Sequence, residues 1–295
     1  MADRGIEAVR AHLAKLPPSD SLTTAERRAQ YERAEKVFPT PPDVKVEHVS
    51  APTVLAEWLR PPGAEPGRVV LYLHGGGYVI GSPRSHRHLA AAIASAAGAS
   101  ALLLDYRLAP EHPFPAAVED ATAAYRWLLE QAIAPGHIVI AGDSAGGGLT
   151  VATLLALREA RVPLPAAGVC ISPWVDLTCG GASYGTKAEV DPIVRRASVE
   201  EMARAYLGAT PARTPLASPL FGDLGGLPPL LIHVGRDEVL LDDAVQLAER
   251  AKAAGVDTTL EVYERMIHVW HWFLPMLDEA QSAVEAIGRF VRRHA

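Results

Sequence analysis

Residues 142–146 read Gly-Asp-Ser-Ala-Gly and contain the side chain best placed to act as a nucleophile. The apolar run 138–141 precedes them and a helical pattern of small residues follows, so Ser144 is expected at a sharp strand-to-helix turn. Side chains at the two flanking glycines would collide with such a turn. The following helix would direct its free N–H groups to the same place, where negative charge can develop. The pattern therefore predicts nucleophilic chemistry by a serine hydroxyl.

A second motif, His-Gly-Gly-Gly at residues 74–77, ends the strand-like run 69–73. Glycines let a backbone approach a substrate closely and point its N–H groups at it. Alone, the glycines are also typical of a flexible turn, and the serine motif of a phosphate-binding loop or a chance match. Both motifs in this order, each after a strand, indicate the arrangement found in lipases and esterases. His74 precedes the glycines, and we interpret it as a structural brace for the loop.

A serine nucleophile needs a base within hydrogen-bond reach and a group that orients that base. In a sheet of this kind these partners follow later strands in the order serine, acid, histidine. Among 11 histidines, His268 comes directly after the last strand-like run and is predicted to be the base. His271 is the nearest alternative, but it follows about one helical turn later and is expected to pack or to face solvent.

The acid is expected on the loop after residues 230–234. Asp237 is the first carboxylate of that loop and is predicted to fix the His268 tautomer and to stabilise the imidazolium, without taking its proton. Glu238 is the main alternative. Asp242 and Asp243 are expected to begin the next helix, where carboxylates interact favourably with the helix dipole.

No metal or cofactor is expected. His86 and His88 could suggest a metal site, but no cysteine or carboxylate stands at a suitable spacing from them. Asp143 is interpreted as a supporting residue of the serine turn rather than a reacting group.

Alternating strand and helix patterns surround these residues. Strand-like runs cover residues 44–49, 53–58, 69–73, 101–104, 138–141, 167–171, 230–234 and 258–263. Helical patterns cover residues 85–97, 115–131, 145–159, 241–254 and 274–293. Most of the strands are continuously apolar, as expected for strands covered on both faces. The order predicts an α/β fold with a mostly parallel central sheet and helices on both faces, after an antiparallel pair at the start.

Two segments lie outside this alternation. Before residue 44 we expect two amphipathic helices. The first repeats apolar residues at helical spacing and ends at two prolines: Ile6, Val9, Leu13, Leu16, then Pro17 and Pro18. The second starts near Thr23, which has capping-box spacing to Glu26, and runs towards Val37. Residues 178–227 contain a helical piece at 199–207 and many glycines and prolines, and are interpreted as an insertion above the strand ends.

Composition excludes several classes of function. A hydrophobic content of 49% in 295 residues is ample for the core of one α/β unit. The net charge of -6, with basic residues dispersed among acids, makes no electrostatic case for nucleic acid or for stable membrane association. Two cysteines make no disulfide framework, and the early acidic residues predict no signal peptide. We therefore expect a cytoplasmic protein that acts on a small molecule.

Taken together, these residues resemble the hormone-sensitive lipase family of α/β-hydrolases, in particular its bacterial carboxylesterases. The likeness is carried by residues 74–81, Tyr-Arg-Leu-Ala-Pro-Glu at 106–111, residues 142–147, and the loops of Asp237 and His268. The resemblance implies that Gly76, Gly77 and Ala145 supply the N–H groups of an oxyanion hole. Two positions depart from the family pattern: Glu238 replaces the proline that often follows the acid, and Val269 replaces the glycine that often follows the histidine.

The resemblance also implies a helical cap. Its two parts would be residues 1–43 and a second segment at about 178–227, inserted in a catalytic domain at 44–295. Members of the family often dimerise through a sheet edge, so a homodimer is one candidate assembly.

The expected function is that of a serine carboxylesterase that hydrolyses short- to medium-chain esters through an acyl-enzyme. Tyr184, Leu207 and Trp270 are candidates for apolar contact with the acyl chain. Three alternatives use the same fold: an amidase or peptidase with the same triad, a lipase acting at oil–water interfaces, and a non-catalytic small-molecule receptor. A receptor of this kind would lack the working base, whereas the sequence retains all three expected side chains.

Overall fold

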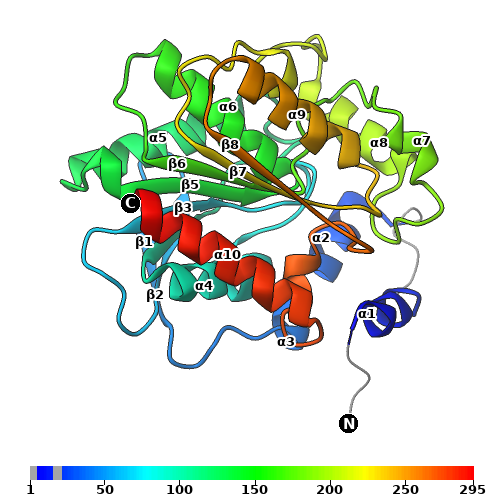
Figure 1. Ribbon diagram of the computed structural model, residues 1–295, viewed down its shortest axis with the longest axis horizontal. Coiled ribbons are helices and arrows are strands. Elements are labelled where there is room, and N and C mark those ends of the chain that lie inside the picture. Colours follow the sequence, from blue (N-terminus) through cyan, green and yellow to red (C-terminus); the bar gives the residue numbers. More distant parts are fainter. Residues whose placement is uncertain (1–4, 16–21) are drawn as a thin grey trace.

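An eight-stranded sheet crosses the described part of the chain, residues 5–15 and 22–295 of a computed structural model (Figure 1). Its strands lie in the order β1-β2-β4-β3-β5-β6-β7-β8, and β2 is antiparallel to both neighbours while the other pairs are parallel. The strands are β1 Lys45–Ser50, β2 Leu55–Arg60, β3 Val69–Leu73, β4 Ser100–Leu104, β5 Ile138–Asp143, β6 Ala167–Ile171, β7 Leu230–Gly235 and β8 Thr258–Tyr263. The predicted α/β class with a mostly parallel sheet is confirmed.

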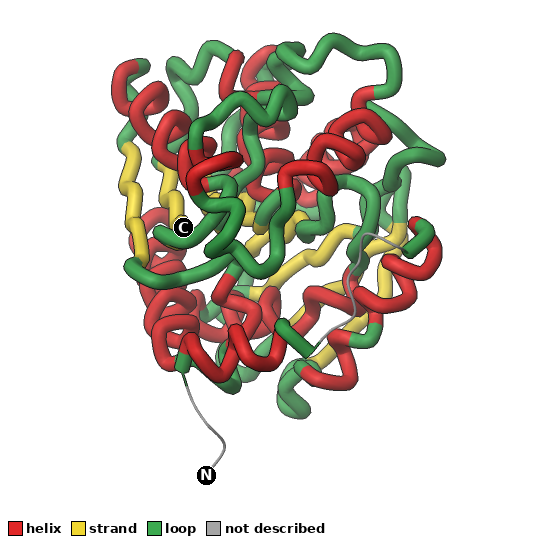
Figure 2. Tube along the Cα trace, turned by 90° about the vertical axis from the view of Figure 1, so that its right-hand side faces the viewer, coloured by secondary structure: helices red, strands yellow, loops and turns green. Residues whose placement is uncertain are grey.

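Helices cover both faces of this sheet, which explains why its inner strands are apolar throughout. Along β3, Val70 and Tyr72 pack with α4 and α10, whereas Leu71 and Leu73 belong to the core formed with α5, α6 and α9. This alternation is the two-residue period of a strand. Figure 1 shows α4 and α10 on one side of the sheet and α6 and α9 on the other. In Figure 2 the strands, in yellow, run between the helices of the two layers.

Within the described residues, three helices precede β1, and from β3 onward helices separate each strand from the next. The helices are α1 Ile6–Leu13, α2 Thr24–Glu32, α3 Ala34–Val37, α4 Pro83–Ala97, α5 Ala116–Glu130, α6 Ala145–Glu159, α7 Ser183–Thr186, α8 Arg196–Leu207, α9 Leu241–Ala253 and α10 Asp278–His294, with short 3-10 turns η2 Pro135–His137, η3 Pro219–Phe221 and η4 Trp270–Phe273. None of the helices in these described ranges is long and apolar enough to cross a bilayer.

Several element limits differ from the sequence prediction. The last helix starts at Asp278 and not at residue 274, because η4 and a short connection occupy the residues before it. The predicted second helix is divided at Arg33 into α2 and α3. Its capping box is confirmed, since the Thr23 hydroxyl accepts from the Glu26 N–H while the Glu26 carboxylate accepts from the Thr23 N–H. The predicted helix end at residues 16–18 lies outside the described residues.

The first helix, α1, lies against the loop that follows β8, whereas α2 and α3 contact α4. Ile6 and Val9 of α1 share a separate apolar cluster with Ile267, Trp270 and Phe273, the residues around the loop after β8. The α1 helix therefore packs on the segment that carries His268.

Candidate active site

Ser144 and His268 meet at the carboxyl ends of the parallel strands. Ser144 follows β5 directly, and His268 lies on the loop between β8 and η4. The Ser144 hydroxyl donates to His268 Nε2 at 2.9 Å, although the two residues are 124 positions apart in the sequence. An imidazole in this position can remove the hydroxyl proton as the oxygen attacks an electrophile. The structure therefore brings the predicted nucleophile and the predicted base together.

Glu238, rather than Asp237, is the carboxylate that contacts the imidazole. The His268 Nδ1–H donates to Glu238 Oε2 at 2.9 Å, and the Glu238 side chain is fully buried. Asp237 turns elsewhere: its Oδ2 accepts from Arg10 Nη2 at 2.9 Å, and Lys187 Nζ lies 3.8 Å from its Oδ1. The prediction that Asp237 orients His268 is therefore wrong, and the alternative Glu238 has that position.

The local backbone explains which of the two adjacent acids reaches the ring. The Asp237 N–H donates to Met266 O at 3.0 Å, which joins the acid loop to the histidine loop. A Cβ atom on Gly235 would collide with the Met266 carbonyl and approach Glu238 Oε1, so a glycine lets these groups close on one another. Glu238 therefore points inward to the His268 imidazole, and Asp237 points outward to Arg10 of α1. Two consecutive acids after a strand were visible in the sequence, but their order along the chain did not reveal which one faces inward.

Ser172 is a residue of this site that the sequence reasoning missed. It follows β6 and has a φ of 45°, a conformation that is uncommon for a residue with a side chain. Its hydroxyl donates to Glu238 Oε1 at 2.8 Å and accepts from the Val269 N–H at 3.1 Å. Ser172 thus connects the acid to the residue after His268. A polar residue at the carboxyl end of a parallel strand was the available signal.

The turn at Ser144 has the strained backbone that its motif predicts. Ser144 has φ 53° and ψ −120°, and α6 begins at the next residue. A side chain on Gly142 or Gly146 would collide with the Leu73 carbonyl at the end of β3. The Ser144 N–H donates to Ile171 O at 2.8 Å. Since strain of this kind persists only where the surroundings enforce it, the packing of strands around the turn holds the hydroxyl in place.

Gly76 and Gly77 lie on the loop after β3 and have φ values of 115° and 62°. A Cβ atom on Gly76 would collide with the Ile80 carbonyl, so the loop requires glycine there. Within the described chain, the backbone N–H groups of Gly76, Gly77 and Ala145 donate to no protein acceptor. Unpaired N–H groups near a nucleophile are the donors that an oxyanion needs.

Asp143, the last residue of β5, anchors the beginning of this glycine loop. Its Oδ1 accepts from the Gly75 N–H at 3.1 Å and from the Tyr72 hydroxyl at 2.8 Å. Burial alone would raise the pKa of Asp143, but the neighbouring His86 and the Tyr72 bond outweigh it and lower the pKa. His74 is fully buried and its Nδ1–H donates to Gly75 O at 2.7 Å. Burial lowers the pKa of His74 to about 3, so the ring is neutral at pH 7 and acts as a brace rather than a base.

Known proteins share this architecture. A family described by the α/β-hydrolase fold matches residues 70–272. An acetyl-hydrolase of Streptomyces hygroscopicus is 54% identical over 271 residues, which cover 90% of this chain and 89% of that protein. The crystal structure of an esterase/lipase from an uncultured bacterium has a TM-score of 0.93 at 51% identity, over 97% of both chains. An esterase from the bacterial hormone-sensitive lipase family has a TM-score of 0.93 at 52% identity, over 97% of this chain and 95% of that one.

The chain belongs to the hormone-sensitive lipase family of α/β-hydrolases. The resemblance inferred from its motifs is thereby confirmed.

The electrostatics of this α/β-hydrolase suit a base that accepts a proton from Ser144. Burial alone would lower the pKa of His268, but the hydrogen bond and the negative charge of Glu238 outweigh it and raise the pKa above its ordinary value. A carboxylate on Nδ1 also fixes the tautomer whose Nε2 is free to accept. His271 packs instead against His233, at 3.1 Å between Nε2 and the facing Nδ1, and is fully buried. The choice of His268 over His271 matches this geometry.

The candidate acyl-chain contacts of the hydrolase differ in their surroundings. Trp270 is fully buried among Tyr263, His233 and the α1 cluster, so its ring has no exposed face towards an acyl chain, and its contact with a substrate stays a prediction. Tyr184 and Leu207 lie in the core that includes α8 and are buried as well. Sequence reasoning missed Met202, whose thioether lies so close to Gly77 that a Cβ atom there would collide with it. Met202 is half-buried and comes from the helix that passes over the glycine loop.

The two histidines that suggested a metal site have other partners in this hydrolase. His86 Nε2 lies 3.4 Å from Asp143 Oδ2, and His88 Nε2–H donates to Trp272 O at 3.1 Å. Among the described residues, no group of three or more histidines, cysteines and acids is arranged to hold a metal ion.

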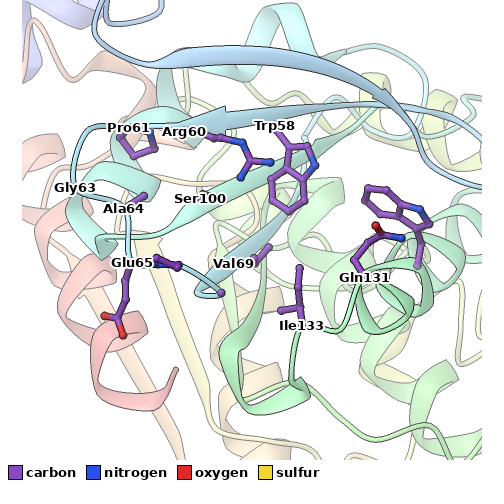
Figure 3. Close-up of a pocket in the computed structure, with 13 residues that line it drawn as sticks. Trp58, Arg60, Pro61, Gly63, Ala64, Glu65, Val69, Ser100, Gln131 and Ile133 are labelled. Carbon is purple, nitrogen blue, oxygen red and sulfur yellow. The ribbon is translucent and has the colours of Figure 1, made fainter.

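A cavity of about 530 Å³ lies at the opposite end of the sheet (Figure 3). Val69 and Ser100, which begin β3 and β4, line it, as does Trp58, whose ring lies 4.6 Å under the Arg60 guanidinium. None of its lining residues belongs to the Ser144 site. Because the predicted nucleophile, the predicted base and the unpaired N–H groups all gather at the carboxyl ends of the strands, that end of the sheet and not this cavity is the candidate active site.

Proposed function

We propose that this protein is a serine carboxylesterase in which Ser144 is the nucleophile, His268 the general base and acid, and Glu238 the group that orients His268. The observation that carries the proposal is the continuous chain of two 2.9 Å hydrogen bonds from the Ser144 hydroxyl through the imidazole to a buried carboxylate. That the protein is a carboxylic ester hydrolase rests on its family and on relatives named as esterases and as an acetyl-hydrolase.

The reaction proceeds in two acyl-transfer steps. Ser144 Oγ attacks the carbonyl carbon of the ester while its proton moves to His268 Nε2. The negative charge that forms on the carbonyl oxygen is stabilised by the N–H groups of Gly76, Gly77 and Ala145. His268 then donates its proton to the departing alcohol oxygen, which breaks the ester bond and leaves an acyl-enzyme. In the second step water attacks the acyl carbon while His268 takes its proton. His268 then returns a proton to Ser144 Oγ as the bond to the acyl group breaks, which releases the carboxylic acid and restores the Ser144 hydroxyl. Glu238 stays ionised throughout and stabilises the imidazolium.

Esters with short to medium acyl chains are the proposed substrates. The buried packing of α8 and the closeness of Met202 to Gly77 leave the glycine loop covered, which favours small soluble esters over long acyl chains. The acetyl-hydrolase relative supports the short end of this range. A series of p-nitrophenyl esters from acetate to palmitate, together with a triglyceride emulsion, separates an esterase from a lipase. Matched anilides separate it from an amidase or peptidase.

The decisive experiment replaces the nucleophile. Ser144→Ala should abolish hydrolysis of p-nitrophenyl butyrate, with a loss of at least about 10³-fold, because no hydroxyl remains to form the acyl-enzyme. The circular dichroism spectrum and the thermal midpoint should stay close to those of the wild type. A folded Ser144→Ala variant with full activity would overturn the proposal, and a wild-type protein that binds esters without turnover would favour the receptor alternative.

The remaining expectations are part of the same proposal. We propose that α1, α2 and α3 form one part of a cap and that residues 178–227 form the other, as supported by the contacts of α1 with the His268 loop and of α8 with the glycine loop. The free, buried Cys170 and Cys179 support a reducing, cytoplasmic location. Assembly as a homodimer stays a prediction, and light scattering coupled to size-exclusion chromatography tests it.

A further inference from the structure

Arg28 of α2 reaches from the N-terminal segment into the loop that contains Gly76 and Gly77. Its Nε–H donates to the backbone carbonyl of Val79 at 2.9 Å. Its Nη2 donates to Ala109 O at 2.9 Å and, with Nη1, forms a two-pronged pair with the Glu111 carboxylate at 2.7 and 2.8 Å. One guanidinium thereby joins α2, the glycine loop and the loop after β4.

The bond to Val79 acts on the part of the loop that orients the glycines. Gly76 O accepts from the N–H groups of Val79 and Ile80 at 3.1 and 3.0 Å, so residues 76–80 form one tight turn. Tyr78 O accepts from the Ala109 N–H at 2.9 Å. A rotation of the Val79 peptide would therefore also change the orientation of the Gly76 and Gly77 peptides, because the hydrogen bonds of the turn connect them. The N–H groups of Gly76 and Gly77 have no protein acceptor within the described chain.

The loop is held at both of its ends by side chains. Asp143 accepts from the Gly75 N–H at the beginning, and Arg28 donates to the Val79 carbonyl at the end. Val79 is buried, so without Arg28 its carbonyl would lose its charged donor in a place that water reaches poorly. A guanidinium suits this task because its donors form a rigid planar fork, which fixes several acceptors at once.

We infer that Arg28 is a positioning residue for the oxyanion hole: it holds the Val79 peptide so that the N–H groups of Gly76 and Gly77 face the position of the developing oxyanion. This inference rests on the proposed esterase function. Its distinctive consequence concerns the transition state, because the N–H groups bind an oxyanion more strongly than a trigonal carbonyl. The ion pair with Glu111 is incidental, since that carboxylate is largely exposed and exposed pairs contribute little.

The test measures binding to the tetrahedral state separately from binding to the ground state. Arg28→Ala should lower kcat for p-nitrophenyl butyrate by about 10- to 100-fold, since a displacement of about 1 Å can cost about 10² in rate, while KM stays within about twofold. An alkyl trifluoromethyl ketone forms a tetrahedral adduct on Ser144 that carries the oxyanion. Its affinity should fall by the same factor as kcat, whereas the matched methyl ketone should bind as it does to the wild type.

Three variants serve as controls. Glu111→Gln removes the charge of the ion pair but leaves the Arg28 bond to Val79, and should stay within about threefold of wild-type kcat. Arg33→Ala removes an exposed arginine of the same segment and should behave likewise. Arg28→Lys keeps the charge without the fork, and should recover part of the kcat that Arg28→Ala loses; it also replaces Arg28→Ala if that variant fails to fold.

The outcomes separate the two proposals. A folded Arg28 variant with unchanged kcat and unchanged trifluoromethyl ketone affinity would overturn the role of Arg28 and leave the esterase assignment intact. Equal losses in KM, in methyl ketone affinity and in trifluoromethyl ketone affinity would also overturn it, since they indicate a general disturbance of the pocket. Full activity of Ser144→Ala would instead remove the function on which the inference rests.

Discussion

On the nucleophile side of this site, steric limits on the backbone shape the Ser144 turn and the Gly76 loop, which Asp143 and Arg28 then anchor, whereas on the acid–base side the acid and the base are aligned by hydrogen bonds between side chains. Ser144 and Gly76 have positive φ, and neighbouring carbonyls leave no room for a side chain at Gly76 or at the two glycines that flank Ser144. Glu238 and His268 lie on loops that are joined by the Ser172 hydroxyl and by one another. The geometry around Ser144 and Gly76 thus depends on which residue types fit a turn. The geometry of Glu238 and His268 depends on which side chains face each other after folding.

The comparison extends to the N-terminal helices, which contact both sides. Arg28 of α2 bonds the end of the glycine loop, and Arg10 of α1 bonds Asp237 and the Val190 carbonyl. Asp237 therefore anchors α1 beside the acid loop without touching the imidazole. Of the two neighbouring acids, Asp237 contacts an arginine of α1, whereas Glu238 contacts the imidazole of the proposed base.

The largest expected effect comes from removing one of those two acids, Glu238, and the comparison is with removal of the other. Glu238→Ala should lower kcat for p-nitrophenyl butyrate by about 10⁴-fold, as loss of the orienting carboxylate does in serine hydrolases. Asp237→Ala should lower it by less than about tenfold, because only a partly exposed ion pair is lost. Steady-state kinetics on both folded variants measures the ratio. If Asp237→Ala proved the more damaging of the two, the assignment of the acid would be reversed.

A smaller loss is expected when a side chain is added on the nucleophile side. Gly76→Ala places a Cβ atom against the Ile80 carbonyl and imposes a strained φ, so the turn must open and move its N–H groups. We expect a loss of about 10²-fold in kcat, the lower end of the range for removal of one oxyanion donor. Ala90→Gly in the buried part of α4 is a control for stability alone, with thermal denaturation recorded for both. Wild-type kcat in a folded Gly76→Ala variant would contradict the backbone account.

The smallest effect is a shift of the pH profile. In the proposed mechanism catalysis requires neutral His268, so the raised pKa of this ring should place the acid limb of kcat/KM above the ordinary histidine value of 6.5. In Glu238→Gln the carboxylate charge is gone while burial remains, so the pKa of His268 should fall and the acid limb of the residual activity should move to lower pH. Rates measured from pH 4 to 9 for the wild type and for Glu238→Gln give the acid limb of each protein. An acid limb at the same pH in both would show that Glu238 does not set the pKa of His268.

Residue types at special backbone positions were readable from the sequence. The motifs around Ser144 and Gly76 predicted a serine turn and a glycine loop, since few other residue types tolerate those conformations. The strands 69–73, 167–171 and 258–263 were predicted with their observed limits. The first two are continuous apolar runs, as buried strands are, whereas the third is a partly polar edge strand. His268 was identified by its place after the last strand.

Contacts between distant side chains were not readable in the same way. The choice of Asp237 used order along the chain, but the burial of Glu238 depends on the Gly235 turn and on Ser172 from another strand. Trp270 was an expected substrate contact, yet its ring packs under α1, which the local sequence does not reveal. Met202 and Arg28 came to the glycine loop only through the packing of α8 and α2.

By itself, the sequence determined the α/β class, the strained turn and glycine loop, and the choice of Ser144 and His268 as the proposed nucleophile and base, because short-range sterics and strand periodicity act on neighbouring residues. Only the tertiary structure decided which of two adjacent acids faces the imidazole and which side chains brace the loops, because such contacts depend on the relative placement of segments that are separate in the sequence, from 30 positions between Glu238 and His268 to 227 between Arg10 and Asp237.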